Sequence, residues 1–278
     1  MKNIYKFLVK LLPEVVREFI LLAILRDRHV LAKNRCWKNS GKGKRAWVLA
    51  TGPSLKDVDL SMLKDEDCFS VSNFFLHKQL TDLKLKAHFF AGYHSPLEKG
   101  NFINWLRNAD ERLPKATEIF VSIADKKMIE ENGIFRERNI FYLAIGSRRF
   151  GNIDCEKLVP VIQTGPQMIV NLLLYAGYKE IYLMGCDHNT LKNYGDVVEN
   201  FYLPELELRK NATSGAGWLP IVVHLQTQVR VFEIYEALKL NNPHVSIYNC
   251  SPISWLRFTS IPYANFEELF SNDKKVNF

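Results

Sequence analysis

Two short turns in the sequence have the composition of loops that hold a phosphate group. Thr51-Gly52-Pro53-Ser54 follows an apolar run, and Gln163-Thr164-Gly165-Pro166 precedes a helical pattern. Glycine lets the backbone turn tightly or approach a ligand closely, and the free amide groups at a helix start attract an anion. The first turn can equally be a plain connection between a strand and a helix, so by itself it is only a site candidate.

Each turn is expected to open a helix. Ser54 has the side chain of an N-cap for a helix over 54–63, with Asp57 in the capping-box position. Thr164 or Gly165 is expected to cap a helix over 166–176 that begins with Pro166, where the missing N–H costs nothing. Both helix starts would then face the carboxyl ends of strands, where open α/β sheets bind their ligands.

Groups that can transfer a proton lie beyond two other segments. Asp187 and His188 follow the buried run 180–185, and His224 precedes a helical pattern over roughly 226–240. Histidine serves as a general base near neutral pH, although a histidine at a helix start can also simply cap or pack. Asp187 and His188 alone are too few ligands to predict a divalent metal ion. The sequence therefore predicts a metal-free site.

Strands and helices must alternate to position these residues. Apolar runs of strand length occur at 46–51, 68–72, 87–92, 118–122, 140–143, 180–185 and 245–249. Helical patterns separate most of them. This alternation predicts βαβ units and a Rossmann-like α/β fold, with a mainly parallel sheet flanked by helices.

Composition divides the chain into three parts. Residues 1–45 are expected to form a basic helix and linker, 46–260 the α/β domain, and 261–278 a C-terminal tail. Within the domain, the stretch 195–223 breaks the strand-helix rhythm and is rich in loop-forming residues. A long loop of this kind is typical of a lid or acceptor-binding insertion over a ligand site.

The positive charge of the chain is concentrated at its N-terminus. The whole chain carries +7, but residues 1–45 hold twelve Lys or Arg and three Asp or Glu, a balance of +9 that leaves −2 for the rest. A nearly neutral body argues against a nucleic-acid partner. The five cysteines are scattered without a CxxC pair, which favours the reducing cytoplasm.

The N-terminal segment has the pattern of an amphipathic helix. Apolar residues recur at helical spacing between Lys and Arg residues, and the longest charge-free run, Phe19 to Leu25, is too short to span a bilayer. The segment also lacks a signal-peptide cleavage site. We expect peripheral binding to the inner face of the cell membrane. The alternative is packing on its own chain or on a second copy in a homo-oligomer.

Several motifs, in their order and spacing, resemble those of the bacterial family-42 sialyltransferases. The resemblance extends to a wider group that includes proteins similar to 6-hydroxymethylpterin diphosphokinases. It rests on Gly52 to Lys56, on Gly177 to Leu183 followed by Gly185-Cys186-Asp187, and on His224 ahead of Ile247 to Ser254. It covers roughly residues 46–260 and implies a single nucleotide-binding domain of the variant GT-A type.

The resemblance also implies roles for individual residues. His224 corresponds to the catalytic base, and Tyr194 lies close to a tyrosine that assists the leaving phosphate. Thr51 stands where the family has a donor-binding Asn, and Val161 where it has an Arg. The remaining implied donor-binding positions are Gly52, Pro53, Ser54, Ser72 or Asn73, Gln163, Thr164, Gly165, Asp187, His188 and Asn189.

The resemblance therefore implies an inverting glycosyltransferase. It would transfer sialic acid or a related sugar acid from a CMP-activated donor to a cell-surface glycan or lipooligosaccharide, without a metal or other cofactor. Two alternatives remain at this point: a magnesium-dependent pterin diphosphokinase-like enzyme, and a non-catalytic nucleotide-binding protein of glycan assembly.

Overall fold

Eight parallel strands form one sheet at the centre of the molecule. The computed structural model describes residues 12–94, 97–195, 199–207 and 220–271. The sheet order is β6-β5-β4-β3-β2-β1-β7-β8. The strands are β1 (Arg45–Leu49), β2 (Cys68–Val71), β3 (Leu85–Phe90), β4 (Glu118–Ser122), β5 (Ile140–Ser147), β6 (Leu158–Pro160), β7 (Glu180–Met184) and β8 (Ser246–Asn249).

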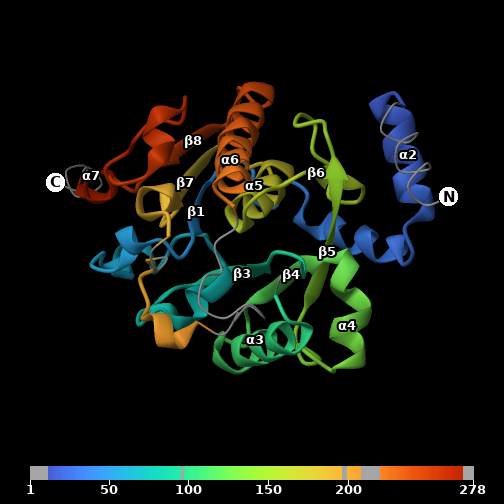
Figure 1. Ribbon diagram of the computed structural model, residues 1–278, viewed down its shortest axis with the longest axis horizontal. Coiled ribbons are helices and arrows are strands. Elements are labelled where there is room, and N and C mark those ends of the chain that lie inside the picture. Colours follow the sequence, from blue (N-terminus) through green and yellow to red (C-terminus); the bar gives the residue numbers. More distant parts are fainter. Residues whose placement is uncertain (1–11, 95–96, 196–198, 208–219, 272–278) are drawn as a thin grey trace.

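Helices cover both faces of this sheet, as a parallel sheet requires. Figure 1 shows α5 and α6 on one face and α3 and α4 on the other. The described helices are α2 (Glu14–Ile24), α3 (Lys99–Arg112), α4 (Lys126–Glu131), α5 (Gly165–Tyr175), α6 (Ile221–Asn241) and α7 (Phe266–Ser271). The predicted α/β class, Rossmann-like with a parallel sheet between helices, is confirmed.

Alternation along β1 shows how the sheet separates two cores. Trp47 and Leu49 pack into the cluster that contains residues of α3 and α4. Ala46 and Val48 point to the opposite face and pack with residues of α5 and α6. Because both faces are buried, the strand reads in the sequence as one unbroken apolar run rather than as alternating polar and apolar residues.

The chain reverses its direction across the sheet at β1. From β1 it moves outward through β2 to β6, and α5 then carries it back to β7 on the other side of β1. Such a switch point opens a crevice at the carboxyl ends of the flanking strands, since the two connections leave in opposite directions. Both turns singled out in the sequence lie at this end of the sheet.

The helix predicted over 54–63 is wrong. Two short 3₁₀ turns, Pro53–Leu55 and Leu60–Leu63, replace it. Asp59 between them is extended, and its carboxylate accepts a hydrogen bond from the Ser61 amide at 3.0 Å. A side chain that captures a nearby backbone amide competes with helix formation. Gln79 further holds this break by accepting from the Leu60 amide at 2.9 Å.

The second half of the basic N-terminal segment belongs to the core. A 3₁₀ stretch, Arg28–Trp37, buries Leu31, Asn34 and Trp37. The Trp37 ring packs edge-on against Phe120 at 5.5 Å and against Phe69 at 5.9 Å between ring centroids. Residues 1–11, the start of the predicted helix, lie outside the described residues. At the other end of the chain, α7 packs Phe266 against Trp47.

No helix within the described ranges is long and apolar enough to cross a membrane.

Candidate functional site

A cavity of about 390 Å³ opens at the switch point, at the carboxyl ends of β1, β2 and β7 and beside the start of α5. All but three of the predicted site residues line it. The predicted residues that line the cavity are Thr51, Gly52, Pro53, Ser72, Gln163, Thr164, Gly165, Asp187, His188, Asn189 and His224. Ser54, Asn73 and Tyr194 lie around it and have other partners. Four separate segments of the chain and α6 therefore converge on one site.

The carboxylate of Asp187 holds the first turn in place. It accepts hydrogen bonds from the Ser54 amide at 2.9 Å and from the Ser54 hydroxyl at 2.6 Å. The Ser54 hydroxyl also contacts that of Ser251 at 2.9 Å, and the Gly52 amide donates to the Gly185 carbonyl at 2.8 Å. Ser54 therefore does not cap a helix. Asp187 joins the end of β7 to the end of β1.

Position 52 requires a glycine because there is no room for a side chain, not because of its backbone conformation. Its φ of −64° is one that any residue adopts. A Cβ at this position would collide with the Asp187 carboxylate and with the Gly185 carbonyl oxygen. The close approach that the sequence predicted at Gly52 is thus an approach to the chain's own β7 end.

Thr164 occupies the N-cap position of α5, as predicted, but its side chain makes no capping hydrogen bond, and the turn leaves few amides for a ligand. The side-chain oxygen of Gln167 accepts from the Gln163 amide at 2.8 Å and from the Thr164 amide at 3.2 Å. Pro166 has no N–H, and Gly165 packs tightly on Val71. The positive end of the α5 dipole therefore faces the cavity, with most of its first amide groups already used.

Ser72, not Asn73, lies at the cavity. Ser72 has a left-handed backbone, with φ of +62°. The buried His88 supports it: Nε2 donates to the Ser72 carbonyl at 3.0 Å, and Nδ1 accepts from the Ser70 hydroxyl at 2.6 Å. A carbonyl oxygen can only accept, so this geometry fixes the tautomer of neutral His88.

Asn73 anchors part of the predicted lid. Its amide donates to the Tyr202 hydroxyl at 2.8 Å and to Glu207 at 3.1 Å, and its side-chain oxygen accepts from Trp105. The stretch 199–207 is thereby fixed at the rim, where the Phe201 amide donates to the Thr51 carbonyl at 3.2 Å. The other parts of the 195–223 insertion at 196–198 and 208–219 lie outside the described residues.

The first turns of α6 provide one wall of the cavity. His224 and Gln228 are four residues apart and therefore share a helix face. The Tyr194 ring meets the His224 ring edge-on at 5.6 Å between centroids. The predicted base and the predicted phosphate-assisting tyrosine are thus neighbours, although Tyr194 itself does not line the cavity.

Gln228 is a site residue that the sequence reasoning missed. Its side chain is buried, lines the cavity, and its Nε2 has no hydrogen-bond partner among the described residues. A buried donor without an acceptor is costly, so a ligand oxygen at this point would gain a strong contact. The four-residue spacing from His224 is the signal that would have indicated it.

His188 is held as a neutral ring beside the cavity. Its backbone is left-handed, with φ of +47°, and its Nε2 lies 3.2 Å from the Tyr235 hydroxyl. Burial lowers the pKa of His188 to about 4. A left-handed backbone is strained at any residue other than glycine and persists only where surrounding contacts enforce it. His188 shares this conformation with Ser72.

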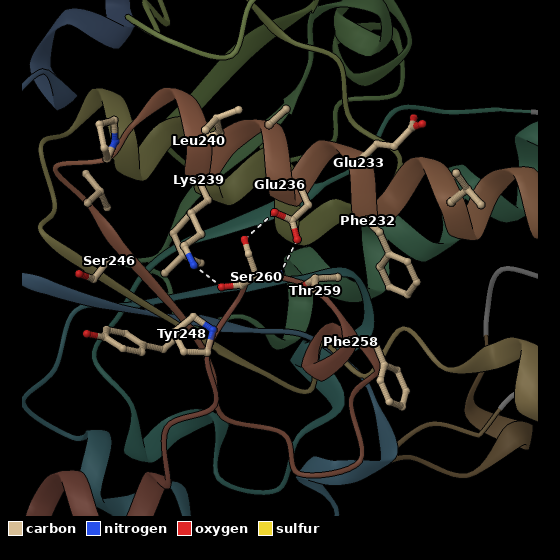
Figure 2. A pocket seen from close by; sticks show the side chains of 16 residues that line it. Phe232, Glu233, Glu236, Lys239, Leu240, Ser246, Tyr248, Phe258, Thr259 and Ser260 are labelled. Carbon is tan, nitrogen blue, oxygen red and sulfur yellow. Dashed lines mark hydrogen bonds between the residues drawn. The ribbon is translucent and has the colours of Figure 1, made fainter.

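A larger groove lies on the other side of α6 and lacks the features of a polar site. Figure 2 shows it between α6, β8 and residues 258–262. Its volume is about 1130 Å³. Its lining is mainly apolar, and Glu236 and Lys239 are both paired with Ser260. None of the predicted site residues lines it. The smaller cavity is therefore the candidate active site.

In the part of the chain that the structure describes, no three His, Cys, Asp or Glu side chains come together as metal ligands would.

No known protein-family profile matches the sequence, and no protein of curated function matches it. Among solved structures, the chain is similar to the sialyltransferase CstII from Campylobacter jejuni in complex with cytidine-5'-monophosphate. The two share 17% identity over 81% of this chain and 88% of that chain, with a TM-score of 0.42. It is also similar to the MAf glycosyltransferase from Magnetospirillum magneticum, at 13% identity over 86% of this chain and 38% of that one, with a TM-score of 0.46.

We predict that Gly52→Ala destabilises the protein by about 1–3 kcal/mol, because the added methyl group displaces either the Asp187 carboxylate or the Gly185 backbone. The control is Gly100→Ala in α3, where a Cβ meets nothing within 4 Å. It should be neutral or stabilise by about 0.5–1 kcal/mol. Urea unfolding measures both. Equal stability of the two variants would contradict the close approach.

We also predict acid destabilisation from His88 and His188. Burial lowers the pKa of His188 to about 4 and that of His88 to about 3, against 6.5 for an unperturbed histidine. Between these pKa values and 6.5, the two histidines are therefore protonated in the unfolded chain but not in the folded protein. Their stabilising contribution is complete above pH about 6.5 and declines as the pH falls toward these values, by up to about 1.4 kcal/mol per pH unit for each ring.

Urea unfolding between pH 7.5 and 5 measures this decline. His188→Phe should flatten it, so that the variant gains about 2 kcal/mol relative to the original protein between pH 7.5 and 5. His244→Ala, at an exposed position, is the control. An unchanged slope in His188→Phe would show that His188 is not held neutral.

Proposed function

We propose that the protein is a metal-independent, inverting glycosyltransferase that uses a nucleotide-activated sugar. The observation that carries the proposal is that His224 and the start of α5 line the same cavity at the switch point of the sheet. A transferase of this kind must stabilise a departing phosphate and deprotonate an acceptor hydroxyl within one site. The α5 dipole serves the first task and the His224 imidazole the second.

The donor phosphate is proposed to lie between the two turns. The hydroxyl groups of Thr51 and Ser72, the start of α5 and the Gln228 amide offer donors and positive potential there. Negative charge grows on the phosphate oxygen as its bond to the anomeric carbon breaks. Donors fixed in advance around that oxygen stabilise it without a metal ion, since they need no reorganisation during the reaction.

His224 is proposed as the general base. It removes the proton of the acceptor hydroxyl while that oxygen attacks the anomeric carbon, and the bonding electrons of the departing group move onto the nucleotide phosphate. One direct displacement inverts the configuration at that carbon. Tyr194, whose ring contacts that of His224, is in position to orient the base.

The finer assignment concerns the donor and acceptor. We propose a CMP-linked sialic acid or related sugar acid as donor, on the strength of the motif resemblance around Gly52, Asp187 and His224. The Gln228 amide suits such a donor, because a sugar carboxylate or the phosphate can accept its hydrogen bond. The acceptor is proposed to be a glycan or glycolipid.

The test is release of CMP from CMP-activated sugars in the presence of a varied acceptor panel. His224→Ala should lower the rate about 10²–10⁴-fold, the contribution of a general base. His244→Ala, at an exposed position outside the cavity, should keep full activity. EDTA should have no effect.

Absence of turnover with every CMP donor would contradict the donor assignment. Phosphate transfer from ATP that requires Mg²⁺ would indicate a diphosphokinase instead. Thermal stabilisation by a nucleotide without turnover of any donor would indicate a binding protein.

Gln228→Leu gives a separate prediction about ligand contact. Removal of a buried amide whose Nε2 has no partner in the described part of the chain should leave the unliganded protein as stable as before or slightly more so. The stabilisation by CMP in a thermal-shift measurement should fall, since the ligand loses a hydrogen bond. Gln226→Leu, exposed on another face of α6, is the matched control. An unchanged response to CMP would remove Gln228 from the site.

A further inference from the structure

The helix α2 is attached to the body through its polar side chains. Glu14 accepts a hydrogen bond from the Arg148 amide at 2.9 Å, and Arg17 donates to the Gly146 carbonyl at 3.0 Å. Glu18 pairs with Arg149 and accepts from the Ser147 hydroxyl. These contacts place α2 at the end of β5, and Figure 1 shows it standing to one side of the sheet.

Four large apolar side chains of α2 are exposed, although Leu22 packs partly against the core. Phe19 is 74% exposed, Val15 64%, Ile24 59% and Val16 44%. A helix that packs on its own core shows the opposite arrangement, with the apolar stripe inward and the charges outward. Several large apolar residues exposed together on one short helix mark an interaction surface.

Charge favours an anionic lipid surface as the occupant of this face. The segment 1–30, which contains α2, carries six Lys or Arg and three Asp or Glu, a balance of +3. Arg26 and Arg28 are exposed just after α2. A symmetric dimer through α2 would bring two such segments together, which opposes association. A negatively charged bilayer surface attracts the same charge by about 1 kcal/mol per basic residue near it.

The helix can lie on a bilayer but cannot cross one. Its 11 residues span about 16 Å, about half of the hydrocarbon thickness.

The helix α2 and the candidate site lie at the same edge of the sheet. All eight strands are parallel, so the carboxyl end of β5, where α2 is attached, and the cavity at the carboxyl ends of β1, β2 and β7 lie at one edge of the sheet. β5 is four strands from β1, about 19 Å away at the usual strand spacing.

We infer that α2 rests on an anionic membrane surface through the face formed by Val15, Val16 and Phe19, and thereby turns the edge of the sheet that carries the cavity toward the bilayer. The acceptor is then a glycolipid presented at that surface. This last step depends on the proposed function, whereas membrane binding does not.

The test is co-sedimentation of the full chain with vesicles of phosphatidylcholine, with or without phosphatidylserine. We expect binding to the vesicles that contain phosphatidylserine, and weaker binding in high salt. Phe19→Glu should reduce the partition coefficient by about tenfold or more, the worth of one buried Phe side chain. The matched control, Leu240→Glu, changes a residue that is 80% exposed in the groove of Figure 2 and should bind as the original protein does.

Three results would overturn the inference: no binding to anionic vesicles, equal binding of Phe19→Glu and the original protein, or a dimer in light scattering that Phe19→Glu dissociates. Circular dichroism verifies that both variants are folded. Vesicle binding needs no donor or acceptor, so it can succeed where the proposed glycosyl transfer fails. Release of CMP with a soluble acceptor should be the same in Phe19→Glu and in the original protein.

Discussion

The Asp187 carboxylate is the contact on which the geometry of the cavity depends. It lies at the end of β7 and binds both the amide and the hydroxyl of Ser54, beyond the end of β1. A buried carboxylate is tolerated only when hydrogen bonds replace its water, and the first turn supplies them. The same contact leaves no room for a side chain at Gly52. A residue expected to touch the ligand instead fixes the walls around it, and only the remaining groups face the cavity.

Local signals in the sequence were sufficient for seven of the eight strands. Each strand predicted from an apolar run exists, because a strand covered on both faces must be apolar along its length. The eighth strand, β6, has only three residues. It was missed because Pro160 interrupts the short apolar run 158–162, and a proline within a run argues against a strand. The failed helix at 54–63 has a long-range cause: Gln79, about twenty residues away, and Asp59 take the amides that a helix would have used.

The sequence predicted where the site lies, but it predicted less well what each residue contacts there. A switch point in a parallel sheet defines where a ligand binds, and the two turns and His224 reach that place. Which of two neighbouring residues faces the cavity depends on contacts with remote parts of the chain. Asn73 turns away because Tyr202 and Glu207 bind it, whereas Ser72 faces the cavity with His88 behind its carbonyl. Nothing in the sequence around Ser72 indicates those partners.

The N-terminal segment is basic throughout, but the part that contains Trp37 is buried in the body of the protein. The Trp37 ring fills a space among Phe69, Phe120 and Phe141, on strands that follow it in the chain. The segment is therefore synthesised before the surface that receives it, and it completes that surface only after the sheet has formed. A truncated form for crystallisation or assay should keep the chain from Arg28 onward, since a cut at the apparent domain boundary near residue 45 would expose three aromatic rings.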